Sequence, residues 1–115
     1  MRTGAGAALF ALAASGLGAA LVAAAAAVGA ADRARTHEVV IQGLVYVPDT
    51  LTVRPGDVVV WTNKDPFPHT VTAAGAFDSG SIAVGKSWRF TAKKPGTHSY
   101  LCTLHTTMKG TLRVE

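Results

Sequence analysis

Hydrophobic residues alternate with polar ones in short runs from residue 37 to the C-terminus, and turn residues separate the runs. The clearest alternation is Ser87–Thr91, in which Trp88 and Phe90 are expected to face the core. Several runs end at a pair of residues that favours a turn, namely Pro48-Asp49, Pro55-Gly56 and Pro95-Gly96. No segment has a helical period long enough to compete, so the pattern predicts an all-β domain over residues 37–115.

We expect about seven or eight short strands in this domain. A loop interrupts them at residues 63–68, because an Asn, an Asp and two prolines within six residues cannot continue a central strand. Strands of this number and length form a Greek-key β-sandwich or a small barrel. The predicted strands cover residues 39–47, 51–53, 58–63, 69–73, a short segment near Ile82, 87–91, 97–102 and 110–114.

Residues 1–30 differ in composition from the predicted domain. Arg2 supplies a positive charge, and no charged residue follows until Asp32. Such a segment is typical of a signal peptide, and the small residues around Ala30 suit cleavage there. The alternative is an uncleaved membrane anchor, since about twenty apolar residues can cross a bilayer, although a span rich in Ala and Gly gains less from lipid than one rich in Leu. Both readings place the domain outside the cytoplasm, in a periplasm or another extracytoplasmic space.

The charge of the chain argues against a nucleic-acid partner. The net charge is +4 at pH 7, and loss of residues 1–30 would remove one basic residue and no acidic one. Nucleic-acid binding requires clustered basic residues. Those of the domain are scattered, at Arg54, Lys64, Lys86, Arg89, Lys93, Lys94, Lys109 and Arg113. Contact with a membrane is expected only if the N-terminal segment is retained.

The single cysteine, Cys102, excludes an internal disulfide, although exported domains of this size often contain one. A lone thiol in an oxidising compartment is buried and inert, paired with another molecule, or bound to a metal. The neighbouring residues favour the metal. Cys102, His105 and Met108 follow one another at intervals of three in a loop between two predicted strands, so their side chains can converge on one point. His69, directly after the 63–68 loop, is the candidate for a second imidazole.

This set of donor atoms is specific about its metal. A thiolate and two imidazoles in a roughly trigonal plane, with a weak axial thioether, favour copper and tune its potential. Zinc prefers four strong ligands, and a thioether is a poor one. Taken singly, a Met is usually core filler, and a lone Cys or His has an ordinary explanation too. Their joint spacing predicts one copper ion that cycles between Cu(II) and Cu(I).

The chain resembles the cupredoxins, or blue copper proteins, over about residues 38–115. Within that family it is most similar to the amicyanins, because only two residues separate His105 from Met108, and plastocyanins and pseudoazurins are more distant. The motifs that carry the resemblance are Tyr46-Val47-Pro48, Leu51-Thr52-Val53, Gly56-Asp57-Val58, Trp61-Thr62-Asn63, His69-Thr70-Val71, Phe77-Asp78-Ser79-Gly80, Pro95-Gly96-Thr97 and the segment from Cys102 to Gly110.

The resemblance implies a role for each candidate residue. The copper ligands would be, in chain order, His69, Cys102, His105 and Met108, the last of them axial. Asn63 would hydrogen-bond the loop just after the cysteine, at Thr103, and so stiffen it; its other reading is an ordinary turn residue. His98, four residues before the cysteine, points inward in the predicted strand and is expected to be a core histidine rather than a further ligand.

Copper in this setting implies electron transfer between proteins outside the cytoplasm. His105 would lie near solvent, and a small apolar surface around it would dock redox partners transiently, with the protein itself monomeric. We expect that surface to consist of Pro66, Phe67, Pro68, Leu104, Thr106 and Thr107. The alternative is an envelope protein that binds or delivers copper without reversible redox cycling. An enzyme is not expected, because multicopper oxidases need further paired histidines and a Cys-His nucleophile needs an orienting partner.

Overall fold

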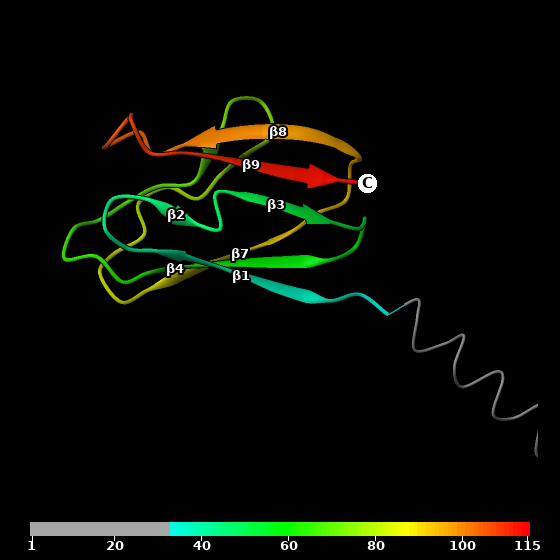
Figure 1. Cartoon of the computed structure of the whole chain (residues 1–115), viewed down its shortest axis with the longest axis horizontal. Coiled ribbons are helices and arrows are strands. Elements are labelled where there is room, and N and C mark those ends of the chain that lie inside the picture. The colour runs from blue at the N-terminus through cyan, green and yellow to red at the C-terminus, as the bar shows by residue number, and fades with distance from the viewer. Residues whose placement is uncertain (1–32) are drawn as a thin grey trace, which may run out of the picture. The chain divides into compact units, whose positions relative to one another are not determined.

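The structure is a computed structural model that describes residues 33–115 (Figure 1). Nine strands and no helix occur in this part of the chain, so the all-β prediction is confirmed there. The strands form two sheets, one of four strands and one of five. The predicted export segment, residues 1–30, lies outside the described residues. Within residues 33–115, no helix is long and apolar enough to cross a membrane.

The first sheet has the strand order β2-β1-β4-β7. β1 (Thr36–Ile41) runs parallel to β4 (Val58–Asn63), and β7 (Ser87–Thr91) lies antiparallel to β4 on its other side. The short β2 (Tyr46–Val47) folds back antiparallel onto the end of β1. β1 and β4 therefore begin together at one end of the sheet and finish together at the other.

The second sheet has the strand order β3-β9-β8-β5-β6. β3 (Thr50–Val53) is parallel to β9 (Lys109–Val114), and β9 is antiparallel to β8 (Gly96–Leu101). β5 (Thr72–Ala73) is antiparallel both to β8 and to β6 (Phe77–Asp78). The loop between β8 and β9, drawn in orange, lies at the end of the domain opposite the C-terminus (Figure 1).

A tight turn divides the predicted strand 39–47 into β1 and β2, which is one reason why nine strands occur where seven or eight were expected. Gly43 and Leu44 form the turn, with φ angles of 69° and 62°. Two successive residues of positive φ match the twist of a two-residue hairpin, although a non-glycine residue seldom adopts this conformation. The turn leaves both of its N–H groups outside the hairpin ladder.

The region after β4 also differs from the prediction. Only Thr72–Ala73 of the expected strand 69–73 is a strand, because His69 forms an isolated bridge to Ile82 instead. β6 lies in a stretch that was expected to be a loop, and it pairs with β5. Two-residue strands carry no hydrophobic period, so a sequence pattern cannot reveal them.

The core lies between the two sheets and follows the alternation of the strands. Every second residue of β4 is buried, and Trp61 is completely so. The Trp61 Nε1–H donates a hydrogen bond to the hydroxyl of Tyr100 on β8 (3.2 Å), which joins the two sheets. Trp88 and Phe90 are half-buried and pack on this core, as their alternation predicts.

The candidate site residues gather at one end of the two sheets. β4 leads into the loop that ends at His69, and β8 leads directly into Cys102. Thr72 of β5 pairs with Leu101 of β8, so the chain shortly after His69 lies beside the residue that precedes Cys102. Two segments more than thirty residues apart in sequence therefore meet at this end.

Candidate metal centre

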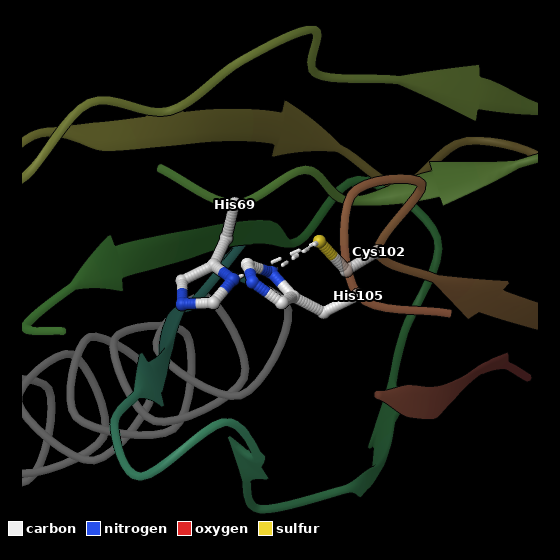
Figure 2. A group of neighbouring side chains, drawn as sticks. All are labelled: His69, Cys102 and His105. Carbon is white, nitrogen blue, oxygen red and sulfur yellow. Dashed lines mark hydrogen bonds between the residues drawn. The ribbon is translucent and has the colours of Figure 1, made fainter. Parts of the chain in front are cut away.

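Three candidate donor atoms converge where these segments meet (Figure 2). Cys102 Sγ lies 3.7 Å from His69 Nδ1 and 3.9 Å from His105 Nδ1. The donor atoms of the three side chains all lie within 4.8 Å of one another, and this is the one such group of His, Cys, Asp or Glu found in residues 33–115. The structure thus brings together three of the four residues that the sequence predicts as ligands.

Met108, the fourth, is buried and closes the loop that holds Cys102 and His105. The Met108 N–H donates a hydrogen bond to the carbonyl of His105 (2.9 Å), and the Cys102 N–H donates to the carbonyl of Met108 (3.1 Å). These two backbone bonds curl the chain into one turn just before β9. The spacing of three residues therefore produces a single compact loop, as predicted.

The Cys102 thiol is completely buried and is held by the segment that follows His69. The Thr70 N–H donates a hydrogen bond to Cys102 Sγ (3.3 Å). The Thr70 hydroxyl oxygen accepts a hydrogen bond from the N–H of Thr103 (2.9 Å). A hydrogen bond to sulfur favours the thiolate, which is the form that binds a metal ion. Thr70 therefore connects the two ligand-bearing loops and donates a hydrogen bond to the sulfur of Cys102.

His69 is completely buried, and its two ring nitrogens face different partners. Nδ1 faces Cys102 Sγ, whereas Nε2 lies 2.9 Å from Oδ2 of Asp65. Asp65 is 5% exposed, and its two carboxylate oxygens accept hydrogen bonds from the N–H groups of Gly43 (2.6 Å) and Leu44 (2.9 Å). One ring nitrogen is therefore available to a metal, and the other is committed to a carboxylate.

The Asp65 carboxyl group is held in its ionised form. Burial alone would raise its pKa, but the hydrogen bonds from Leu44, Gly43 and His69 outweigh that effect, so the pKa of Asp65 is lowered from its ordinary value. Every buried side-chain nitrogen or oxygen within residues 33–115 has a hydrogen-bond partner. A buried polar network is stabilising only when its members are satisfied in this way.

The predicted hydrogen bond between Asn63 and Thr103 is wrong. The Asn63 side-chain amide donates instead to the carbonyls of Phe67 (2.7 Å) and Ile82 (3.0 Å), and its oxygen accepts from the N–H of Asp65 (2.9 Å). Asn63 is completely buried at the end of β4, so its short side chain reaches the loop that begins there and not the cysteine loop. It therefore fixes the loop that follows β4.

His105 has different surroundings, because it is half-buried beside exposed residues. Its ring centre lies 4.9 Å from that of His69 and 6.1 Å from that of Phe67. Phe67 is 47% exposed and Leu104 is 54% exposed. All six residues predicted for the docking surface are exposed, namely Pro66, Phe67, Pro68, Leu104, Thr106 and Thr107. The His105 edge is thus the side of the site that another protein can reach.

His98 does not belong to the metal-binding group. It is half-buried, its ring centre lies 6.1 Å from that of Phe77, and its Nε2 lies 3.4 Å from the carbonyl oxygen of Lys94. The prediction that His98 is not a ligand agrees with this position. It lies at the edge of the core, however, because it stands near the start of β8, where the sheet is less covered.

His37 forms a second histidine–aspartate pair, at the start of β1 and β4. Its Nε2 lies 2.9 Å from Oδ2 of Asp57, which is buried. Hydrogen bonds from the Arg35 N–H, the His37 ring and the Arg54 N–H lower the pKa of Asp57 to about 2. β4 separates this pair from the candidate metal centre.

Two residues that contact the candidate ligands were not singled out by the sequence. Asp65 stands four residues before His69, and a carboxylate in a ligand loop is a usable signal, because metal-binding histidines commonly donate their second N–H to one. Thr70 acts on Cys102 through its backbone N–H. Every residue except proline has that group, so the sequence carries no signal for this bond.

The arrangement fits a type 1 copper site. A thiolate and two imidazoles that converge at one point, with a buried methionine in the same loop, suit copper better than zinc. The Cys102 sulfur is protected from solvent and accepts a hydrogen bond from the Thr70 N–H. The nitrogen atoms that face the sulfur are those of one buried ring and one half-buried ring, so the site has a closed side and an open side.

Comparison with known sequences adds a family context. The model of the family described as Cupredoxin-like domain matches residues 8–114. The chloroplastic plastocyanin of Fritillaria agrestis is 33% identical over 107 residues, in a match that covers 77% of this chain and 64% of that protein. Amicyanin of Paracoccus versutus is 31% identical over 81 residues, with 65% and 61% covered. The chain thus spans a little under two thirds of each of these relatives.

Three further matches are one sequence relative and two solved structures. Amicyanin-alpha of Methylorubrum extorquens is 33% identical over 92 residues, in a match that covers 71% of this chain and 74% of that protein. A solved structure of an oxidised amicyanin variant is similar with a TM-score of 0.67 and 28% identity, covering 70% of this chain and 82% of that one. A copper-containing nitrite reductase of Thermus scotoductus has a TM-score of 0.66 and 26% identity, but only 22% of its chain is covered.

Proposed function

Because this chain belongs to the cupredoxin family, we propose that it is a mononuclear type 1 copper protein that transfers electrons by cycling between Cu(II) and Cu(I). The observation that carries the proposal is the convergence of Cys102 Sγ with one ring nitrogen each from His69 and His105. The similar proteins include amicyanins and plastocyanins. The spacing of two residues between His105 and Met108 is the feature of the ligand loop that resembles the amicyanins.

His69, Cys102, His105 and Met108 would hold the copper ion in this proposal. Copper bound there would supply the centre that gains and loses an electron. The chain supplies a fixed set of donors: the Cys102 thiolate receives the Thr70 N–H, and the loop from Cys102 to Met108 is closed by its own backbone bonds. Ligands that are already held in place need to move little when the charge of the ion changes, which favours rapid transfer.

The docking face in this proposal surrounds His105. Phe67 and Leu104 are exposed apolar side chains on two different loops, and the Phe67 ring lies near the His105 ring. A small apolar surface of this kind suits weak and transient contact, which a monomeric electron shuttle needs in order to release its partner. The whole proposed face consists of Pro66, Phe67, Pro68, Leu104, Thr106 and Thr107.

We place the folded body, the cupredoxin domain of residues 37–115, outside the cytoplasm. The support is the charge-free segment that precedes it, read as a signal peptide over residues 1–30 or as an uncleaved anchor. An extracytoplasmic location also suits the lone thiol, because a metal ion would protect Cys102 from oxidation and from pairing with other thiols.

The test is a visible absorption spectrum of the purified protein after addition of one equivalent of Cu(II), followed by ascorbate and then reoxidation in air. We expect an intense blue charge-transfer band that bleaches with ascorbate and returns on reoxidation. Cys102→Ser is the matched control, since it removes the sulfur with little change in volume and should abolish the band.

Each alternative gives a different result in the same experiment. A pale protein that nonetheless binds one copper ion tightly would support the copper-binding or copper-delivery reading. An intense band that does not return after reduction would argue against electron transfer. Failure to bind copper at all would overturn the proposal.

A further inference from the structure

We infer that Asp65 is a positioning residue for the metal centre: its carboxylate holds His69 in the single tautomer and ring orientation that present Nδ1 to the metal, and its charge stabilises Cu(II) relative to Cu(I). The inference rests on the function proposed above. Its first part, however, concerns the protein without metal and can be tested separately.

The Asp65 side chain is engaged by two different parts of the chain, the turn at Gly43 and Leu44 and the ring of His69. Oδ1 accepts the N–H of Gly43 (2.6 Å), and Oδ2 accepts the N–H of Leu44 (2.9 Å) and contacts Nε2 of His69 (2.9 Å). The N–H of Asp65 itself donates to Oδ1 of Asn63 (2.9 Å). With 5% of its surface exposed, the carboxylate has little water to exchange for these partners.

The contacts determine which ring nitrogen of His69 carries the proton. An ionised carboxylate can only accept hydrogen bonds, so the nitrogen that contacts Asp65 must be the donor. In a neutral imidazole the other nitrogen then has a free lone pair. That nitrogen is Nδ1, and it points toward Cys102 Sγ at 3.7 Å. The metal-binding tautomer is therefore selected before the metal arrives.

The carboxylate is in turn anchored by a rigid turn. Gly43 and Leu44 both have positive φ, so their N–H groups point the same way and bind one carboxylate together, as backbone nests do for anions. The turn lies between β1 and β2, which belong to the sheet framework. The position of His69 is thus set from a segment more than twenty residues upstream.

The carboxylate contact is made by one histidine ligand and not by the other. His105 is half-buried, and among residues 33–115 the structure shows a polar contact only for its Nδ1, with Cys102 Sγ. Its Nε2 faces no carboxylate. Removal of Asp65 should therefore change the electronic character of a single ligand.

The charge of Asp65 should affect the two oxidation states unequally. A negative charge one imidazole away from the ion favours the more positive state, here Cu(II). Changes to residues that hydrogen-bond a metal ligand typically cost about 10- to 100-fold in metal affinity. A tenfold loss confined to Cu(II) corresponds to a rise of about 59 mV in the potential of a one-electron couple.

The decisive variant is Asp65→Asn, which keeps the size of the side chain and removes its charge. We expect nitrogen NMR of the metal-free native protein to show His69 protonated at Nε2 alone, and the variant to populate the Nδ1-protonated form as well. In the copper-loaded proteins, the Cu(II) affinity of the variant should fall about tenfold relative to Cu(I). Glu115→Gln is the control, because it removes the same charge at the C-terminus, the end opposite the ligand loop (Figure 1).

Opposite results would overturn the inference. An unchanged His69 tautomer together with an unchanged potential in Asp65→Asn would do so, as would equal potential shifts in Asp65→Asn and Glu115→Gln. If Asp65→Asn does not fold, the NMR spectrum of the metal-free native protein still tests the inference. A mixture of His69 tautomers in that spectrum would show that Asp65 does not fix the tautomer. Failure of the native protein to cycle copper reversibly would remove the proposed function but leave the tautomer result standing.

Discussion

The two histidine ligands proposed for this site are held in contrasting ways. The surroundings of His69 are closed: His69 and Asn63 are completely buried, and a buried carboxylate contacts Nε2. His105 is half-buried, and its surroundings open to exposed residues of both ligand loops, such as Phe67 and Leu104. Stability of the centre and access to it are therefore assigned to different histidine ligands. The His69 side can be closed because the His105 side gives access to the site.

The largest expected effect comes from removing each histidine in turn. His69→Ala should lower the free energy of unfolding of the metal-free protein by about 3 kcal/mol or more, because it leaves the buried Asp65 carboxylate without one of its partners. His105→Ala should cost less than about 1 kcal/mol, since the residue is half-buried. Urea unfolding measures both. Equal costs would mean that the closed and open sides are not energetically distinct.

The same pair of variants separates the two sides by access. Both should lose the blue copper spectrum. Added imidazole should restore it in His105→Ala, whose vacancy faces solvent, and should not restore it in His69→Ala, whose vacancy is enclosed. Rescue of both variants would show that the His69 side opens readily.

The second expected effect concerns the histidine–aspartate pair that lies away from the metal centre. The pair of His37 and Asp57 resembles that of His69 and Asp65 in distance, but it lies at the other end of β4. The pKa of Asp57 is about 2 in the folded protein, below the value of about 3.9 in an unfolded chain. Its contribution to stability is therefore present above about pH 4 and is lost as the pH falls toward 2.

Asp57→Asn should consequently reduce stability at neutral pH and make its decline between about pH 4 and 2 less steep. Unfolding curves of the metal-free protein at several pH values measure this effect. The copper spectrum and the potential should stay as in the native protein. A change in either would mean that the far end of the fold is coupled to the metal centre.

A smaller effect is expected on the open side. Phe67→Asp places a charge in the proposed docking face and should slow electron self-exchange between two copies roughly tenfold, because an aromatic contact residue typically contributes about 1–2 kcal/mol. Line broadening in NMR spectra of mixed Cu(I) and Cu(II) protein measures the rate. Thr97→Asp adds the same charge near the start of β8 and should have no comparable effect. Similar rates in the two variants would argue against this face.

The fold was predictable from the sequence wherever a strand is long enough to show its period. β7 alternates in sequence, and its half-buried Trp88 and Phe90 pack on the core. β4 begins with a continuous apolar run that predicts a buried strand, and every second one of its residues, including Trp61, is buried. The two-residue strands β2 and β5 lie within longer predicted strands, and β6 was not predicted, because the bounds of such short strands depend on the segments with which they pair. Local pattern therefore predicted the longer strands better than the two-residue ones.

The site was predictable to the extent that its chemistry is local. Cys102, His105 and Met108 share one loop, so their spacing alone suggested that they converge. The partners of His69 depend on long-range contacts: Asp65 is held by the Gly43 turn, which no spacing reveals. Asn63 was expected in the right region but with the wrong partner, since several backbone groups lie within its reach.

The smallest expected effect tests what anchors the closed side. Leu44 has a φ of 62° and is 44% exposed, so Leu44→Gly should relieve backbone strain of about 1–2 kcal/mol while costing roughly 0.5–1 kcal/mol in backbone entropy. The net change in stability should stay within about 1 kcal/mol. The potential should be unchanged, because the N–H that binds Asp65 belongs to the backbone and remains. A shift in potential with this variant would mean that the Leu44 side chain, and not the turn itself, shields the His69 side from water.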